Sequence, residues 1–302
     1  MPAYTLKVSG EDAKQRIDIF LTKNIPGLPS RSFVQKLIEN GQVKVNQSPV
    51  KSHYKVLLKD TVEISWEDNQ FAPKDIKPEN ISLDIFYEDS FLIAINKPSG
   101  MLVHPTPTSL TGTLVNALFY HYHQFAEFPD SLRAGIVHRL DKETSGLLLV
   151  AKDHKTHLHL SKQFEQHKIK KKYVALAEGI IEYDEGVIEA PLGRHRVHFD
   201  KISVQFDEEA KEAETFYRVL KRFRKTTLVE LSPRTGRTHQ LRVHMAYLGH
   251  PILGDQKYGK KSSFLRLALH AKAIGFFHPK TKAYLEFSSQ IPKEFLSQQS
   301  LL

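Results

Sequence analysis

Residues 137–151 have the sequence Val-His-Arg-Leu-Asp-Lys-Glu-Thr-Ser-Gly-Leu-Leu-Leu-Val-Ala. Five polar residues from Asp141 onward separate two apolar segments, and Gly146 follows them. This pattern predicts two strands that flank a loop. Binding and catalytic side chains concentrate on loops that a sheet holds in place. Because Arg139 and Lys142 lie close in sequence, we expect Asp141 to be ionised and suited to act as a nucleophile or a base.

Asp141 also has two other interpretations. An Asp at the junction of a strand and a loop frequently serves only to form the turn. The order His-Arg-Leu-Asp at 138–141 has a composition related to that of a protein-kinase catalytic loop. However, no Asn follows at the required spacing, and neither a Gly-rich phosphate loop nor Asp-Phe-Gly occurs in the chain. The kinase interpretation is rejected, whereas the pattern alone leaves open a purely structural Asp141.

The composition is that of a soluble globular protein, with 40% hydrophobic and 25% charged residues. A length of 302 residues predicts about two domains. The net charge of +9 favours a polyanionic partner. The absence of cysteine excludes disulfides and thiolate chemistry. No signal peptide and no apolar run of roughly 18 residues is present, so we expect a cytoplasmic protein that does not bind a membrane.

Residues 1–66 are expected to form a small α/β module that begins with two helices. Apolar residues at 17–21 have the spacing of one helix face, and residues 33–38 carry a second apolar stripe. Ser30 is suited to cap the second helix, and Gly41 is suited to end it.

Residues 43–45 and 62–66 alternate apolar and polar side chains, which predicts short strands after the helices. Basic residues surround these elements, among them Arg31, Lys36 and Lys44. A solvated charged surface explains these residues as well as a face that contacts phosphates does.

Residues 67–79 are polar and contain two prolines, which predicts a moderately stiff linker to a larger domain at 80–302. In that domain, strands are expected at 81–87, 91–95, 136–140, 147–151, 173–177, 216–219, 228–231 and 284–287. Helices are expected at 113–122, 154–167 and 239–248. Strands outnumber helices and do not alternate regularly with them, so the expected class is α+β with a mainly antiparallel sheet.

The string at 137–151 resembles the signature of the RluA-type pseudouridine synthases, which isomerise uridine in structured RNA. Four further motifs match this family in the same order. They are Asn-Lys-Pro-Ser-Gly-Met at 96–101 with Val-His-Pro at 103–105, Lys-Tyr-Val-Ala at 172–175, Gly-Arg-Thr-His-Gln-Leu-Arg-Val-His at 236–244, and His-Pro-Ile-Leu-Gly-Asp at 250–255. The resemblance covers roughly residues 80–297. It implies a mixed, curved sheet with the active site in a cleft across its face.

Residues 31–46 resemble the alpha-L RNA-binding domain first described in a ribosomal small-subunit protein. In that domain, two helices precede a basic hairpin. The resemblance implies that Arg31, Lys36 and Lys44 contact RNA phosphates, which supplies affinity with little sequence information.

Family resemblance places the catalytic carboxylate at Asp141. Pseudouridine and uridine are isomers, so neither a redox cofactor nor ATP is expected. Asp141 can attack carbon 6 of the uracil, attack carbon 1′ of the sugar, or act as a base on the sugar, and the sequence does not separate these routes. The resemblance supplies a cation at Arg242, whose guanidinium is always charged and can hold a carboxylate. In isolation, Arg242 would be interpreted as a solvated helix residue.

The resemblance implies roles for three more residues. Tyr173 stacks on the uracil or helps to remove the proton from carbon 5, although a phenol with a pKa near 10 is a poor base at neutral pH. Arg139, two residues before Asp141 on the same expected strand face, fills the space that an everted uridine leaves; a phosphate contact is the alternative. Leu269 forms part of the apolar floor beneath the base. His138 faces the other way and is expected to be structural.

The sixteen histidines raise the alternative of a zinc site, but neither His-Glu-x-x-His nor a cysteine occurs, so we expect no functional metal. The alpha-L module and the motifs at 133–138, 191–195 and 278–279 look most like the D-type large-subunit group of the family. This implies 23S rRNA as the partner, free or in an assembling large subunit, with no obligatory protein partner indicated. A short segment at 260–266 departs from that pattern. The alternatives are the uridines modified by the C-type large-subunit group, a tRNA substrate, and a non-catalytic RNA-binding assembly factor.

Overall fold

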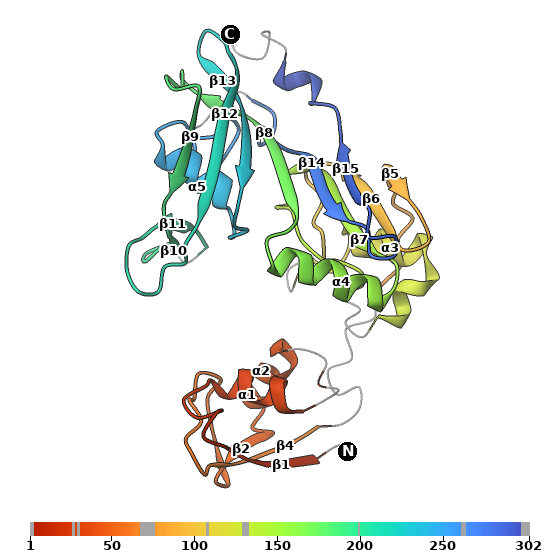
Figure 1. Cartoon of the computed structure of the whole chain (residues 1–302), viewed down its shortest axis with the longest axis vertical. Coiled ribbons are helices and arrows are strands. Elements are labelled where there is room, and N and C mark those ends of the chain that lie inside the picture. Colours follow the sequence, from red (N-terminus) through yellow and green to blue (C-terminus); the bar gives the residue numbers. More distant parts are fainter. Residues whose placement is uncertain are drawn as a thin grey trace. The chain divides into compact units, whose positions relative to one another are not determined.

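The fold is described from a computed structural model, in which backbone contacts separate a smaller unit ending at Ile76 from a larger unit beginning at Lys77 (Figure 1). The described residues are 3–25, 28, 31–66, 76–106, 109–128, 133–198, 200–260 and 264–296. Most of the linker expected at 67–79 lies outside them. The last residues of that range belong to the larger unit, where Glu79 donates its N–H to Asn116 O at 3.0 Å.

Within the described residues, the smaller unit packs two helices on a four-stranded antiparallel sheet. The helices are α1 (Ile17–Asn24) and α2 (Arg31–Glu39), and the strand order is β1 (Ala3–Lys7), β4 (Thr61–Ser65), β2 (Val43–Val45) and β3 (Ser48–Pro49). Apolar residues three and four positions apart on each helix are buried against alternate residues of β2 and β4. The two predicted helices and the two predicted strands are confirmed. β1 was not predicted, and the expected cap Ser30 lies outside the described residues.

In the described part of the larger unit, nine strands form one mixed sheet. Their order is β5 (Ile85–Glu88), β6 (Leu92–Lys97), β7 (Ser145–Ala151), β14 (Leu269–Phe277), β8 (Lys170–Glu178), β13 (Thr226–Pro233), β12 (Glu214–Arg222) and β9 (Glu185–Glu189), with β15 (Tyr284–Ser288) also paired to β14. All neighbouring strands are antiparallel except β7 and β14. The predicted α+β class and mixed, mainly antiparallel sheet are confirmed. The strand expected at 81–87 begins only at Ile85.

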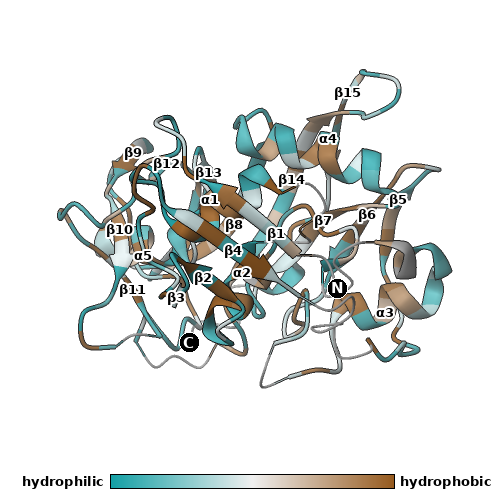
Figure 2. Ribbon diagram, turned by 90° about the horizontal axis from the view of Figure 1, so that it is seen from below, coloured by the Kyte–Doolittle hydropathy of each residue, from teal (hydrophilic) through white to brown (hydrophobic). Residues whose placement is uncertain are grey.

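The three helices expected in this unit are present. They are α3 (Leu114–His121), α4 (His154–Glu165) and α5 (Gln240–Tyr247). Thr113 caps α3, and α4 packs on β7 through buried Leu160 (Figure 1). Figure 2 shows hydrophobic residues along β6 and β7, which form this part of the core. On α5, Gln240 and His244 hydrogen-bond Thr215 of β12 at 3.0 and 2.9 Å, so the helix is fixed to the sheet.

A hairpin of β10 (Leu192–Arg194) and β11 (Ile202–Val204) lies beside α5. It forms a separate two-stranded sheet. The sequence analysis did not predict this hairpin.

The strand expected at 136–140 does not form, apart from one isolated bridge at Ile136. Gly135, immediately before it, has a φ of +69°, which turns the chain out of an extended strand. Asp141 therefore lies on an irregular loop that leads into β7. The argument that put Arg139 on the same strand face as Asp141 is wrong.

The sequence analysis also missed β14, which carries Leu269. This strand pairs with β7 at His270 and Ala271 and with β15 along Ala273–Phe277. Since β7 and β15 share one edge of β14, the contact between β7 and β14 is short. Gly146 faces Ala271 at that contact.

Gly146→Ala is expected to lower the free energy of unfolding by about 3 kcal/mol or more. Gly146 has a φ of +112°, and an added Cβ would collide with the backbone of Ala271, which cannot move without parting β14 from β7. Urea denaturation followed by circular dichroism measures the loss.

Gly249→Ala is the matched control, because Gly249 has a φ of +87° with no other atom within 4 Å of an added Cβ. Only backbone strain then operates, which costs roughly 1–2 kcal/mol. Equal losses in the two variants would show that β7 and β14 do not need this close approach.

Candidate active site

The loop that carries Asp141 is anchored by a buried lysine. Lys97, at the end of β6, has no exposed surface, and its Nζ donates to the carbonyl oxygens of Pro98, Met101 and Lys142 at 2.8, 2.9 and 3.1 Å. These acceptors match the three donors of an ammonium group. Burial lowers the pKa of Lys97 to about 8, while nearby carboxylates, including that of Asp141, oppose the shift.

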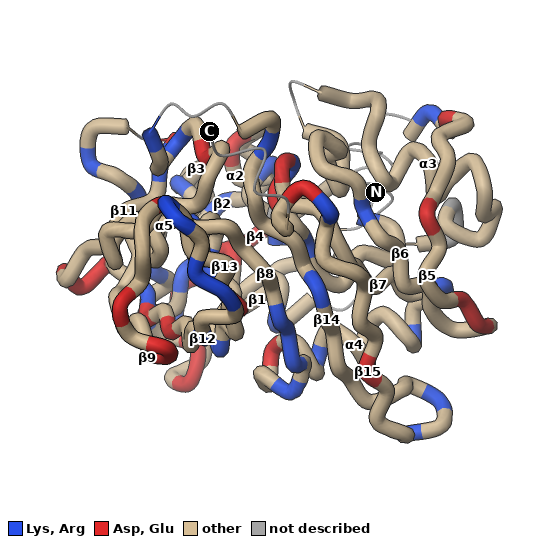
Figure 3. Tube along the Cα trace, turned by 90° about the horizontal axis from the view of Figure 1, so that it is seen from above, with Lys and Arg blue, Asp and Glu red and all other residues tan. Residues whose placement is uncertain are grey.

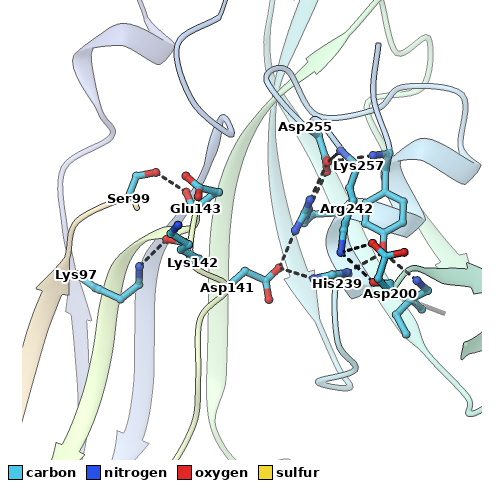
Figure 4. Close-up of polar contacts among 12 residues, drawn as sticks. Lys97, Ser99, Asp141, Lys142, Glu143, Asp200, His239, Arg242, Asp255 and Lys257 are labelled. Carbon is cyan, nitrogen blue, oxygen red and sulfur yellow. Dashed lines mark hydrogen bonds and ion pairs between the residues drawn. The ribbon is translucent and has the colours of Figure 1, made fainter. Parts of the chain in front are cut away.

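Two further hydrogen bonds join the same pair of loops. Ser99 Oγ donates to the carbonyl oxygen of Glu143 at 2.7 Å, and Gly100 N–H donates to that of Lys142 at 2.9 Å. Figure 4 shows Lys97 and Ser99 reaching the loop from one side. The loop therefore holds Asp141 in place although no strand pairs with it.

On the other side, Asp141 meets a guanidinium from α5. Arg242 Nη1 lies 3.4 Å from Asp141 Oδ2 (Figure 4). The sequence motif predicts this juxtaposition, and the structure brings the two side chains together across 101 residues of chain. The Asp141 side chain keeps 22% of its surface exposed, so a ligand can still reach it.

Asp255 holds the opposite edge of this guanidinium. Its two oxygens accept from Arg242 Nε and Nη2, each at 2.8 Å, and its side chain has no exposed surface. The backbone N–H groups of Lys257 and Tyr258 also donate to it, at 2.9 and 3.1 Å. Burial raises the pKa of Asp255, but Arg242 and these N–H groups lower it more, so the pKa stays below its ordinary value. Asp255 ends the motif at 250–255, but the sequence pattern alone did not predict its role.

Tyr258 and His239 complete the surroundings of the pair. The Tyr258 ring packs 5.1 Å from the Arg242 guanidinium, and its hydroxyl bonds His239 Nδ1 at 2.7 Å. His239 Nε2 lies 3.9 Å from Asp141 Oδ2. Burial and the charge of Arg242 lower the pKa of His239, although Asp141 opposes them. His239 is therefore a neutral imidazole beside Asp141 at neutral pH.

A cavity of about 380 Å³ opens beside these groups. Its walls include Arg139, Asp141, Lys171, Tyr173, Arg242 and Leu269. Small-molecule sites span roughly 300–1,000 Å³, so the space is sufficient for part of a nucleotide. The structure thus gathers every candidate site residue of the larger unit at one cavity.

Tyr173 and its strand neighbours follow the predicted alternation. Lys171 and Tyr173 line the cavity from one face of β8, while Lys172 on the other face lies 3.8 Å from Glu230. Burial, with the charge of Asp141, raises the pKa of Tyr173 above its ordinary value of 10.0. The hydroxyl is therefore protonated at neutral pH and is able to donate a hydrogen bond.

His138 and Arg139 lie next to each other at the cavity but differ in their surroundings. His138 Nε2 accepts from Leu149 N–H at 2.9 Å, and its ring stacks on Phe164 at 4.6 Å. Burial lowers the pKa of His138 to about 3, so the ring is neutral and fixed. Arg139 is exposed at the cavity wall.

The RNA-binding candidates of the smaller unit have different surroundings. Arg31 donates to Oδ2 of buried Asp18 at 2.9 Å, so it has a structural role that the sequence did not reveal, although 47% of its side chain is exposed. Lys36 on α2 and Lys44 on β2 are exposed. Basic and acidic residues both occur in each of the two units (Figure 3).

The described residues contain neither a metal-binding cluster nor a membrane-spanning helix. Among them, no group of three or more His, Asp or Glu side chains is placed to hold a metal ion. None of the helices described is long and apolar enough to cross a membrane.

Comparisons with known proteins agree with these motifs. A family model described as RNA pseudouridylate synthase matches residues 91–247, and the S4 domain matches residues 15–62. An uncharacterized RNA pseudouridine synthase of Bacillus subtilis is 43% identical over 291 residues, which are 96% of this chain and 94% of that protein. Ribosomal large subunit pseudouridine synthase D of Pseudomonas aeruginosa is 37% identical over 303 residues, which are 95% of this chain and 92% of that protein. The solved structure of human RNA pseudouridylate synthase domain containing 1 has a TM-score of 0.58 and 27% identity, and the match covers 72% of this chain and 85% of that one.

Asp255→Asn is expected to lower the free energy of unfolding by about 3 kcal/mol near pH 7, because it leaves the buried Arg242 guanidinium beside a neutral amide. The pKa of Asp255 is lowered in the folded state, so its contribution is complete above about pH 4 and disappears as the pH falls through the folded-state value. Urea denaturation at a series of pH values should show a constant difference in the free energy of unfolding between the unchanged protein and Asp255→Asn. This difference should shrink only below about pH 4.

Asp200→Asn is the control, since Asp200 is 65% exposed and pairs with Lys257 in the same region. It should unfold like the unchanged protein. A stability of Asp255→Asn equal to that of the control would mean that Asp255 does not hold Arg242.

Proposed function

Because the chain belongs to the RNA pseudouridylate synthase family and is an RNA pseudouridine synthase, an isomerase, we propose that it converts specific uridines of 23S rRNA to pseudouridine with Asp141 as the catalytic carboxylate. One observation carries the proposal for Asp141. This carboxylate stands at the cavity wall, 3.4 Å from a guanidinium that a second, buried carboxylate already holds.

The reaction constrains what Asp141 has to do. The bond from N1 to carbon 1′ breaks, the uracil turns, and carbon 5 bonds to carbon 1′ while its proton leaves and N1 gains one. A carboxylate can promote this by attacking carbon 6, by attacking carbon 1′, or as a base on the sugar. Each route needs a carboxylate oxygen that faces the nucleotide in a site largely closed to water.

The arrangement of Arg242 suits each of these routes. Its two shortest hydrogen bonds go to Asp255, which leaves a single longer contact of 3.4 Å for Asp141. A bidentate pair with Asp141 would occupy both oxygens of the reacting carboxylate. Because Asp255 takes that pair instead, Asp141 is held in place and keeps an oxygen for the substrate.

Tyr173 and Leu269 supply an aromatic ring and an apolar side chain at the same cavity, which suit the faces of a uracil. We assign Tyr173 to stacking and to hydrogen-bond donation. A base at carbon 5 would need a lowered pKa, whereas burial raises that of Tyr173.

Arg139 is exposed at the cavity wall and close to Asp141 in sequence. A uridine within folded RNA has to leave its stack before it can reach the cavity, which costs a few kcal/mol. We propose that the Arg139 side chain fills the space in the RNA stack that the everted uridine leaves.

The substrate class rests on the relatives and on the smaller unit. Relatives that match along most of this chain are named ribosomal large subunit pseudouridine synthase D. The S4 domain matches residues 15–62, where Lys36 and Lys44 are exposed for RNA phosphates. A ribosomal substrate, free or in an assembling subunit, implies a cytoplasmic location. The alternative substrate is a tRNA.

Cells that lack this gene should lose pseudouridine at specific positions of 23S rRNA, and the unchanged gene should restore them. Asp141→Asn preserves the shape of the side chain but should reduce restoration by at least about a thousandfold. Quantitative mapping of pseudouridine in ribosomal and transfer RNA measures both effects.

Glu143→Gln is the matched control, because Glu143 is an exposed acid two residues away on the same loop, and it should restore the modification fully. Loss of modification in tRNA alone would overturn the 23S assignment. Full restoration by Asp141→Asn would overturn the role of Asp141.

Arg139→Met should lower kcat/KM on a folded stem-loop by about tenfold or more, and much less on an unstructured oligonucleotide with the same target uridine. The reason is that only the stacked uridine requires eversion. Steady-state rates on the two RNAs measure the difference. An equal loss on both would refute this role.

A further inference from the structure

Lys171 is a cavity lysine that the catalytic roles above do not use. It is partly buried on β8, on the strand face that carries Tyr173, and it lines the cavity that contains Asp141. Its Nζ donates to the carbonyl oxygen of Thr235 at 3.3 Å. Gly236 leaves the adjoining wall open, because the nearest atom to a Cβ built there is Lys171 Nζ itself at 3.7 Å.

The protein supplies little to balance the charge of Lys171. Among the described residues, it forms no ion pair with an Asp or Glu, whereas Lys172 lies 3.8 Å from Glu230. Burial lowers the pKa of Lys171, and no carboxylate opposes that shift. By contrast, the buried ammonium of Lys97 is held by three carbonyl oxygens.

Other basic side chains also line the cavity. Among them are Arg139 and Arg237, and the Arg237 Nε donates to the backbone oxygen of Glu212 and not to a carboxylate. The acidic side chain of the cavity wall is that of Asp141, which already pairs with Arg242. The end of the cavity near Lys171 is therefore positive and suits an anion.

Strand geometry relates this end to the position of the base. Residues two apart on one strand face are separated by about 7 Å. An anion on Lys171 would thus lie about one sugar away from a base stacked on Tyr173. Building on the proposed function, we infer that Lys171 binds one of the two backbone phosphates that flank the target uridine and thereby places the nucleotide against Asp141.

The test uses the full-length protein and the 23S rRNA stem-loop that carries the mapped uridine. The RNA is made unchanged, with an uncharged methylphosphonate 5′ of the target, and with one 3′ of it. Lys171→Met removes the charge but keeps an unbranched side chain, and Lys171→Arg keeps the charge. Thermal denaturation of each variant verifies that it folds.

In the unchanged protein, one methylphosphonate should lower kcat/KM by about tenfold or more, as loss of a charged hydrogen bond does. Lys171→Met should lose a similar factor on natural RNA and no further factor on that methylphosphonate RNA, while Lys171→Arg should recover part of it. The sensitive position identifies which phosphate is bound. Two results would overturn the inference. One is a further loss of kcat/KM when Lys171→Met acts on the sensitive methylphosphonate RNA, and the other is an unchanged kcat/KM of the unchanged protein on both methylphosphonate RNAs.

A binding measurement separates this inference from the proposed function. In an Asp141→Asn background, log Kd should depend less steeply on log salt by about 0.7 when Lys171 is also changed to Met. An unchanged slope would overturn the phosphate contact whether or not the protein forms pseudouridine. Absence of product from natural RNA with the unchanged protein, together with the altered slope, would overturn the proposed function alone.

Discussion

The bidentate pair between Arg242 and Asp255 is the interaction on which the site depends. A guanidinium presents its donors in one plane, so a carboxylate bound to Nε and Nη2 determines where Nη1 points. Here Nη1 points at Asp141. Because Asp255 is buried and receives two backbone N–H groups, it holds Arg242 from inside the protein. The Asp141 carboxylate is therefore oriented by one contact to Arg242, and its side chain remains 22% exposed.

The loop that carries Asp141 is held by a different set of contacts. This loop has no neighbouring strand, and Lys97 instead collects three carbonyl oxygens of two loops around one buried ammonium. Directly after the loop, Gly146 allows β7 to approach the backbone of β14. A loop fixed at both ends in this way combines the accessibility of a loop with the precision of a sheet. Packing and electrostatics thus converge on the position of one side chain.

The sequence predicted the parts of this structure that depend on local patterns. Helices α3, α4 and α5 lie within the ranges expected for them, and the order of strands and helices indicated a mainly antiparallel sheet. The strand expected at 136–140 failed because its apolar residues are as compatible with a loop, and the partners that hold that loop lie far away in sequence. Asp255 belonged to a quoted motif, but only the fold shows that it meets Arg242 from behind. The pairing of Arg31 with buried Asp18 on another helix is likewise invisible in a linear pattern.

A crystal structure of the Asp141→Asn variant with its RNA stem-loop tests the central claim most directly. The account predicts an everted uracil between Tyr173 and Leu269, with the side chain at position 141 against the uracil or its sugar and Arg242 still bound to Asp255 by two hydrogen bonds. A target uridine bound outside this cavity, or an Arg242 released from Asp255 and turned away from position 141, would contradict it.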